Sequence, residues 1–158
     1  MPADIRIRGA IMEDAIAIAI LSDQLFQEDA GERDPTMNLG WARQHGQSYF
    51  EQLIAGERRI CFVAEAGNEV IAYLAGYLHG PGEVRPIISA ELESMFVQRP
   101  WRSTGVGSQL IDAFLAWARA EGASRMSVTA YASNARAVAF YQRAGFQPRS
   151  VILEKIIS

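Results

Sequence analysis

Two glycines stand directly before a long amphipathic helix that the sequence predicts. Gly105 and Gly107 allow the backbone to turn tightly and a ligand to approach it closely. The residues that follow place apolar side chains on one helical face, at Val106, Leu110, Phe114, Trp117 and Ala118. This pattern predicts a helix over about 104–121 that stops at Gly122. Because the first amide groups of a helix have no partner inside it, this chain must fold so that those donors meet solvent or a ligand.

Residues 102–108 read Arg-Ser-Thr-Gly-Val-Gly-Ser and are a candidate site for a phosphate group. Free amides and the helix dipole attract anions at a helix start, and Arg102 adds a charged contact. A P-loop needs Lys and then Ser or Thr after its last glycine, whereas Gly107 is followed by Ser and Gln. A dinucleotide fold needs a third glycine, where this chain has Leu110. The segment is therefore either a pyrophosphate site of another kind or a glycine-rich helix start without a ligand.

Hydrophobic periodicity predicts elements in the order strand, two helices, three strands, helix, strand, helix, strand. Strands are expected at 5–8, 60–64, 70–78, 87–97, 126–130 and 151–157. Helices are expected at 12–26, 39–55, 104–121 and 134–144, and loops at 27–38 and 81–86. Gly67 and Asn68 suit a tight turn between the second and third strands. This order predicts an α/β (α+β) fold with helices covering a largely antiparallel sheet, formed by residues 1–158 as a single domain.

Composition and charge exclude several classes of function. The chain carries a formal net charge of -3 and no basic stripe, so no nucleic-acid partner is expected. Cys61 is the single cysteine, which excludes an intrachain disulfide and a cysteine zinc site. His45 and His79 are isolated in the sequence, so no metal is expected. The apolar run at 15–21 is too short for a bilayer, which needs ~20 residues, and no signal segment is evident, so no membrane association and a cytoplasmic location are expected.

Two segments resemble motifs of one enzyme family. Residues 97–107 read Val-Gln-Arg-Pro-Trp-Arg-Ser-Thr-Gly-Val-Gly, which resembles motif A of the GCN5-related N-acetyltransferase (GNAT) superfamily. Residues 134–146 read Asn-Ala-Arg-Ala-Val-Ala-Phe-Tyr-Gln-Arg-Ala-Gly-Phe, which resembles motif B, and both motifs occur in the family's order and spacing. Pro100 lies one position later than usual, and Ser103-Thr104 replaces a frequent Gly-Lys/Arg pair. That second difference removes a basic side chain and keeps the backbone donors.

The resemblance implies a fold, a cosubstrate and a set of binding residues. The fold would be a mixed, largely antiparallel central sheet flanked by about four helices, and the cosubstrate would be acetyl-CoA with no metal. The strand before motif A would carry a bulge and splay from its neighbour, so that pantetheine pairs with its main chain. The residues implied to bind the coenzyme are Met95, Phe96, Val97, Arg102, Ser103, Thr104, Gly105, Val106, Gly107, Ser108 and Asn134. Many relatives are dimers, so the resemblance also allows a homodimer.

Catalytic roles follow from the same resemblance and from the chemistry of acyl transfer to an amine. Family members commonly have a glutamate four residues before the strand valine, which makes Glu93 the candidate general base. Alternatively, Glu93 only binds the acceptor or pairs with an arginine. Strand alternation would place Glu91 and Glu93 on the same side as Met95 and Val97. Tyr141 matches the tyrosine that often protonates the departing thiolate, or it serves only in packing.

The acceptor is specified least. The segment 27–38 holds Glu28, Asp29, Glu32 and Asp34, which would attract a cationic amine or belong to a solvated loop. Aromatic residues available to line a pocket are Trp41, Tyr49, Tyr73, Tyr77 and Trp101. The expected activity is transfer of an acetyl group from acetyl-CoA to a primary amine of a small molecule or peptide, by direct attack in a ternary complex. The alternative is a non-catalytic CoA-binding sensor or regulatory module.

Overall fold

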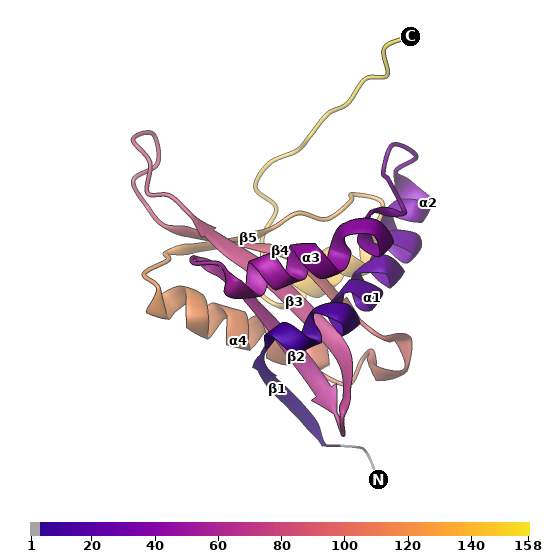
Figure 1. Cartoon of the computed structure of the whole chain (residues 1–158). Helices are drawn as coiled ribbons and strands as arrows, with labels where there is room; N and C mark the ends of the chain where they lie inside the picture. The colour runs from indigo at the N-terminus through magenta and orange to yellow at the C-terminus, as the bar shows by residue number, and fades with distance from the viewer. Residues whose placement is uncertain (1–3) are drawn as a thin grey trace.

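A five-stranded sheet forms the centre of the molecule in the computed structural model, which describes residues 4–158 (Figure 1). Its strands are β1 (Ile5–Gly9), β2 (Arg59–Ala66), β3 (Glu69–His79), β4 (Ser89–Val97) and β5 (Arg125–Val128), which lie side by side in that order. Every neighbouring pair is antiparallel except β4 and β5, which run parallel. The expected mixed and largely antiparallel sheet is confirmed.

Helices cover both faces of this sheet. One face is covered by α1 (Ala15–Leu25) and α3 (Trp41–Ala55), and the other by α4 (Val106–Ala120) and α5 (Ala135–Arg143) (Figure 1). A hydrophobic core lies on each face of the sheet, and successive side chains of β3 point alternately into the two cores. Tyr73 packs under α1 and α3, whereas Leu74 packs under α4. The smaller elements are η1 (Met12–Asp14), the π-helical turn η2 (Phe26–Ala30), α2 (Gly31–Arg33) and η3 (Arg99–Trp101).

Local signals in the sequence located most of these elements. The hairpin turn at Gly67 has a φ of 62°, and Gly122 ends α4 with a φ of 87°, both in the region that favours glycine. Gly145 follows α5 with a φ of 101°, and the amide of Phe146 donates to the carbonyl of Tyr141 at 3.0 Å. Both helix ends therefore have the predicted glycine stop.

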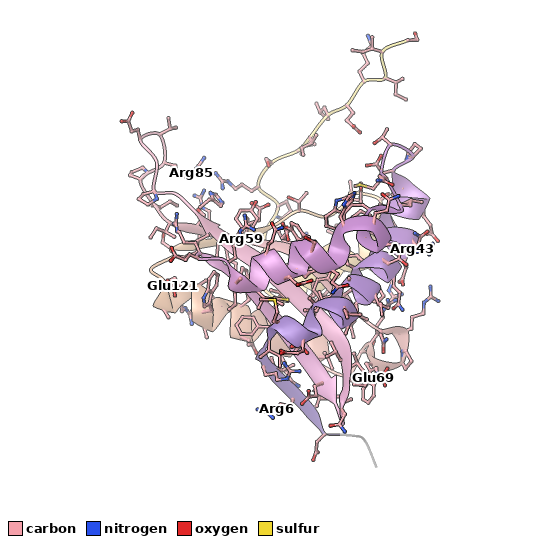
Figure 2. All side chains as sticks on the ribbon, viewed as in Figure 1. Arg6, Arg43, Arg59, Glu69, Arg85 and Glu121 are labelled. Atoms are coloured by element: carbon pink, nitrogen blue, oxygen red, sulfur yellow. The ribbon has the colours of Figure 1, made fainter. Side chains whose placement is uncertain are left out.

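Two predicted elements are wrong. The segment 27–38 is not a loop throughout, because the first helical run continues through η2 and α2 as far as Arg33. The segment 151–157 is not a strand, because its residues pair with no strand among those described. Its apolar side chains are instead 81–94% exposed, at Val151, Ile152, Leu153, Ile156 and Ile157. The tail runs away from the sheet, and its side chains stand clear of the other elements (Figure 2).

No helix within residues 4–158 is both long enough and apolar enough to cross a lipid bilayer.

Candidate active site

Strands β4 and β5 separate halfway along β4. They pair only over Ser89–Leu92, and the rest of β4 pairs with β3 alone. The amide of Gln98 donates to Ile71 of β3 at 3.0 Å, so by alternation the backbone groups of Phe96 also face β3. Those of Met95 and Val97 face the opening that β5 leaves. The opening exposes an unpaired strand edge to which an extended group can add its own hydrogen bonds.

A β-bulge at Glu93 lies at the start of this opening. Ala75 of β3 pairs with Ser94, and the next residue, Gly76, pairs with Leu92, so Glu93 has no partner on β3. Gly76 is required here because a Cβ on it would lie 2.5 Å from the ring of Phe114. The ring of Phe114 therefore packs directly against the backbone of β3 opposite the bulge.

The bulge overturns the expectation that Glu91 and Glu93 share a side with Met95 and Val97. Because one extra residue interrupts the alternation, Glu93 and Ser94 both line the pocket on the α1 and α3 side. Met95 and Val97 pack against the core under α4 instead. The carboxylate of Glu93 therefore reaches the opposite face of the sheet from these two side chains.

Glu93 lines a pocket of about 470 Å³. The phenol of Tyr49, from α3, donates a hydrogen bond to Oε1 of Glu93. Burial and this hydrogen bond raise the pKa of Tyr49 above its usual value, so the phenol stays protonated and orients the carboxylate. Within residues 4–158 no lysine, arginine or histidine forms an ion pair with Glu93. The second carboxylate oxygen accepts no hydrogen bond from these residues and is available to a ligand.

A row of free amide donors lies at the start of α4. Gly105 has a φ of 90°, which a residue with a side chain would adopt only under strain. The amide of Gln109 donates to the carbonyl of Gly105 and begins the helical ladder. None of the backbone amides of 103–108 donates to an acceptor in the described part of the chain. Residues Ser103 to Ser108 thus present free donors of the kind that bind an anion at a helix start, and the anion site itself stays a prediction.

The two glycines of this segment serve different purposes. Gly105 supplies the left-handed turn, whereas a Cβ on Gly107 would lie 3.0 Å from the ring of Phe140. Gly107 therefore permits close packing of α4 against α5, a reason that the sequence did not reveal.

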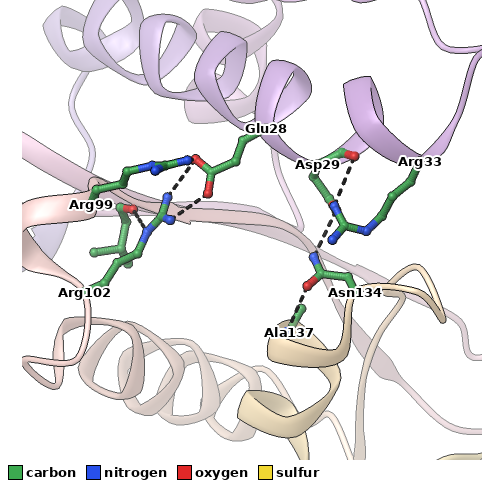
Figure 3. Close-up of polar contacts among 8 residues, drawn as sticks. Glu28, Asp29, Arg33, Arg99, Arg102, Asn134 and Ala137 are labelled. Atoms are coloured by element: carbon green, nitrogen blue, oxygen red, sulfur yellow. Dashed lines mark hydrogen bonds and ion pairs between the residues drawn. The ribbon is translucent and has the colours of Figure 1, made fainter.

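Arg102 does not face the free amides. Its Nη1 and Nη2 donate to the two carboxylate oxygens of Glu28 at 2.6 and 3.0 Å, and its Nε donates to the carbonyl of Val97 at 2.8 Å (Figure 3). The guanidinium also lies over the ring of Phe96, 5.1 Å from its centroid. Arg102 is therefore placed to hold the end of β4 and η2 together rather than to contact a phosphate.

Asn134 has the predicted capping role. Its Oδ1 accepts a hydrogen bond from the amide of Ala137 at 3.1 Å, and its Nδ2 donates to Asp29 at 2.9 Å (Figure 3). Asp29 also accepts a bond from Arg33 at 3.1 Å. Both polar ends of the Asn134 side chain are thus engaged within the protein.

The turn η2 joins the two motif segments. Glu28 and Asp29 are neighbours in sequence, yet one binds the loop before α4 and the other binds the start of α5 (Figure 3). These bonds explain why a segment expected to be a loop is helical. The acidic composition of 27–38 signalled a role for these residues, but their partners lie 74 and 105 positions away and could not be assigned.

Substitution of Glu28 by Gln is expected to lower the free energy of unfolding by about 1 kcal/mol at neutral pH, because a charged hydrogen-bonded pair at a partly exposed position is lost. The hydrogen bond from Arg102 lowers the pKa of Glu28 in the folded state. Its stabilising effect is therefore present above the usual glutamate pKa and disappears as pH falls through the folded value. Urea unfolding at several pH values would measure this, with Glu32→Gln on the exposed side of α2 as the control. An equal loss in both variants would contradict the assignment.

Tyr141 lies on α5, half-buried beside Phe140 and Phe146. Burial raises the pKa of Tyr141 to about 12, with a smaller contribution from the negative charge of Asp29. Its hydroxyl has no hydrogen-bond partner among the described residues. The phenol therefore keeps its proton at neutral pH and is free to donate it.

The other aromatic candidates divide between pocket and core. Trp41 and Tyr49 line the pocket of Glu93, whereas Tyr73 is fully buried and donates to Ser94 at 3.0 Å. Trp101 packs against the core under α4, and Tyr77 lies beside His79. No group of three or more His, Cys, Asp or Glu side chains in the described part of the chain is placed to hold a metal ion.

Comparison with known proteins finds similarity to acetyltransferases. The model of the Acetyltransferase (GNAT) family matches residues 23–146. The uncharacterized N-acetyltransferase MJ1207 of Methanocaldococcus jannaschii is 26% identical over 112 residues, which cover 71% of this chain and 48% of that protein. The chain thus spans about half the length of this curated relative.

Solved structures share the fold over nearly the whole chain. The BH1408 protein of Bacillus halodurans has a TM-score of 0.83 at 22% identity, covering 97% of this chain and 99% of its own. An aminoglycoside N-acetyltransferase, AAC(6')-Iy, was solved in complex with CoA and has a TM-score of 0.78 at 20% identity, covering 98% and 97%. Since the family model spans most of the sequence, including the split strand and the glycine loop, this chain belongs to the acetyltransferase (GNAT) family.

Proposed function

We propose that this chain is an enzyme, a single-domain N-acetyltransferase over residues 1–158, that transfers the acetyl group of acetyl-CoA to a primary amine of a small molecule. The observation that carries the proposal is the carboxylate of Glu93, which lines a pocket at the point where β5 leaves β4 and has no basic partner among the described residues. A cytoplasmic location is part of the proposal, since the free thiol of Cys61 would stay reduced there.

The cosubstrate fits the two unpaired sets of backbone groups. The amides of 103–108 suit a diphosphate, and the open edge of β4 at Met95 and Val97 suits the amide-bearing pantetheine chain. The relative AAC(6')-Iy, which shares this fold, binds CoA. Arg102 and Asn134 would support this site by holding η2 in place rather than by touching the coenzyme.

Glu93 and Tyr141 would each carry out one proton transfer of the reaction. An alkyl ammonium has a reference pKa of ~10.4, so the amine must lose a proton before it attacks. Glu93 accepts that proton, and the amine nitrogen then bonds to the thioester carbonyl carbon. A backbone amide at the open edge of β4 would stabilise the resulting oxyanion. As the carbon–sulfur bond breaks, Tyr141 donates its proton to the departing thiolate. The bonded nitrogen loses its second proton to solvent, solvent returns a proton to the phenol, and Glu93 releases its proton to solvent, so that both residues are restored and one proton is released in each turnover.

The direct test incubates the purified protein with acetyl-CoA and a panel of amines. Release of free thiol is followed in parallel with mass spectrometry of the amine. We expect stoichiometric thiol and acetylated amine, with the product amide formed in one step. If no amine gives thiol release although CoA binds, the non-catalytic sensor would replace this proposal.

Tyr141→Phe is expected to lower kcat by about 10²-fold, near the lower end for a general acid. The effect is moderate because a thiol has a reference pKa of ~8.5 and its thiolate leaves fairly easily. Phe keeps the ring contacts with Phe140 and Phe146, so the affinity for CoA and the thermal stability should hold. An unchanged kcat would contradict the role of Tyr141 as general acid and would mean that this residue serves only in packing.

A homodimer is also part of the proposal. The tail at 151–157 is apolar and exposed and points away from its own sheet (Figure 1), and the outer edge of β5 pairs with no other strand of residues 4–158. Addition of the tail as a strand to β5 of a second copy would bury the apolar side chains of the tail and pair the backbone groups at the edge of β5. Light scattering should give a dimer for the full chain and a monomer after truncation at residue 149. A monomeric full-length protein would refute this.

A further inference from the structure

We infer that the acceptor is an amine carried on an aromatic or similarly flat apolar body, and not a polyhydroxylated amino sugar. This inference rests on the proposed function and adds the chemical class of the acceptor. It comes from the lining of the pocket at Glu93. The lining residues are Ser22, Leu25, Phe26, Asp29, Ala30, Met37, Asn38, Trp41, Tyr49, Phe50, Glu93, Ser94 and Tyr131.

One wall of the pocket is a continuous row of aromatic rings. The ring centroids of Phe26 and Trp41 are 5.7 Å apart, and those of Trp41 and Tyr49 are 5.1 Å apart in an edge-to-face arrangement. Tyr49 ends this row at the carboxylate of Glu93. A flat apolar group can therefore pack along the rings while its nitrogen reaches the carboxylate.

Among the described residues that line the pocket, one carboxylate, that of Glu93, has no basic partner. Asp29 also lines it, but Asp29 already accepts bonds from Arg33 and Asn134. Glu93 accepts a bond only from a neutral phenol. A single ammonium group, attracted by Glu93 and by the faces of the neighbouring rings, fits this charge distribution.

Three polar side chains of the lining already have a hydrogen-bond partner within the protein. The Oγ of Ser94 accepts from Tyr73 at 3.0 Å, the phenol of Tyr131 donates to Asp34 at 3.1 Å, and Asn38 accepts from the amide of Gly40 at 3.1 Å. A polyol entering the pocket would lose hydrogen bonds to water and find few replacements. The lining therefore disfavours sugars with several hydroxyl groups.

A second cavity, of about 750 Å³, differs from the pocket at Glu93 in its lining. It lies on the other side of η2 and is lined mainly by polar and charged side chains, at Asp23, Gln24, Gln27, Glu28, Glu32, Arg43, Phe96, Gln98, Arg99 and Pro100. A polar polycation would suit this groove. Glu93 does not line it, so an amine bound there would lie away from the proposed base.

The test compares kcat/KM for phenethylamine, tyramine and tryptamine with values for ethanolamine, glucosamine and the aminoglycoside sisomicin. We expect the aromatic amines to be preferred by about 10–100-fold, the effect of burying one aromatic side group. Trp41→Leu should raise KM for the aromatic amines by about 10-fold, a larger factor than for ethanolamine. Tyr77→Leu, an aromatic residue outside the pocket, is the matched control.

Preference for glucosamine or sisomicin would overturn the inference and leave acetyl transfer intact. Absence of thiol release with every amine would overturn the proposed function instead. In that case calorimetry would still test whether the pocket binds an aromatic amine, by titrating phenethylamine into the CoA-bound protein. Binding that Trp41→Leu weakens would support the inference, and absence of binding, or binding indifferent to Trp41→Leu, would overturn it.

Discussion

Replacement of Glu93 by Gln is expected to lower kcat by about 10²–10⁴-fold, the usual contribution of a general base. Gln has nearly the same shape and can still accept the hydrogen bond from Tyr49, so the pocket should keep its form. It cannot accept a proton from the ammonium group. Steady-state kinetics with saturating acetyl-CoA would measure the loss, and a thermal unfolding curve would show that the variant is folded.

The pH dependence separates a base from a binding residue. As pH approaches the pKa of the acceptor amine, ~10 for an alkyl amine, more of the amine is already neutral and the need for a base falls. The deficit of Glu93→Gln should therefore shrink with rising pH. Glu91→Gln is the control, because Glu91 lies nearby on β4 but faces His79, 3.8 Å away. A rise in KM with unchanged kcat would contradict the role as base.

Features set by local chemistry were predictable from the sequence. The stop at Gly145, the cap at Asn134 and the turn at Gly105 each depend on a few neighbouring residues, and each is present as expected. The positions of the four long helices follow from the same kind of signal. The free amide donors at 103–108 could be located because a helix start carries such donors whatever surrounds it.

Features set by distant contacts were not predictable. The bulge at Glu93 is a feature of how β4 pairs with β3, and strict alternation along β4 therefore gave the wrong face for this residue. The partners of Glu28 and Asp29 come from the other half of the chain. The apolar tail has strand-like composition but no neighbouring strand, and a strand needs a partner for its hydrogen bonds. Local propensity does not supply such contacts.

Gly105→Glu is expected to weaken the binding of CoA by at least about 100-fold. The site at 103–108 would lose its geometry, because a side chain at a φ of 90° introduces strain of about 1–3 kcal/mol. The new carboxylate would also repel the diphosphate, an effect of up to about 4 kcal/mol for unit charges 4 Å apart near a protein surface. A repulsion near this upper value exceeds the ~2.8 kcal/mol that corresponds to a 100-fold change in affinity, and the altered geometry of the site adds to it. Isothermal titration with CoA would measure the affinity.

Gly122→Glu provides the matched control at the other end of the same helix. Gly122 has a φ of 87°, and a Cβ there would lie 3.8 Å from Ile88, so the variant carries a similar backbone strain and the same added charge. Both variants should lose similar stability on thermal unfolding, because the same strain is introduced at each helix end. Only Gly105→Glu should lose affinity for CoA, because only the start of α4 presents free amide donors to the diphosphate. Equal loss of affinity in both variants would assign the effect to folding, and full affinity in Gly105→Glu would mean that the diphosphate binds elsewhere.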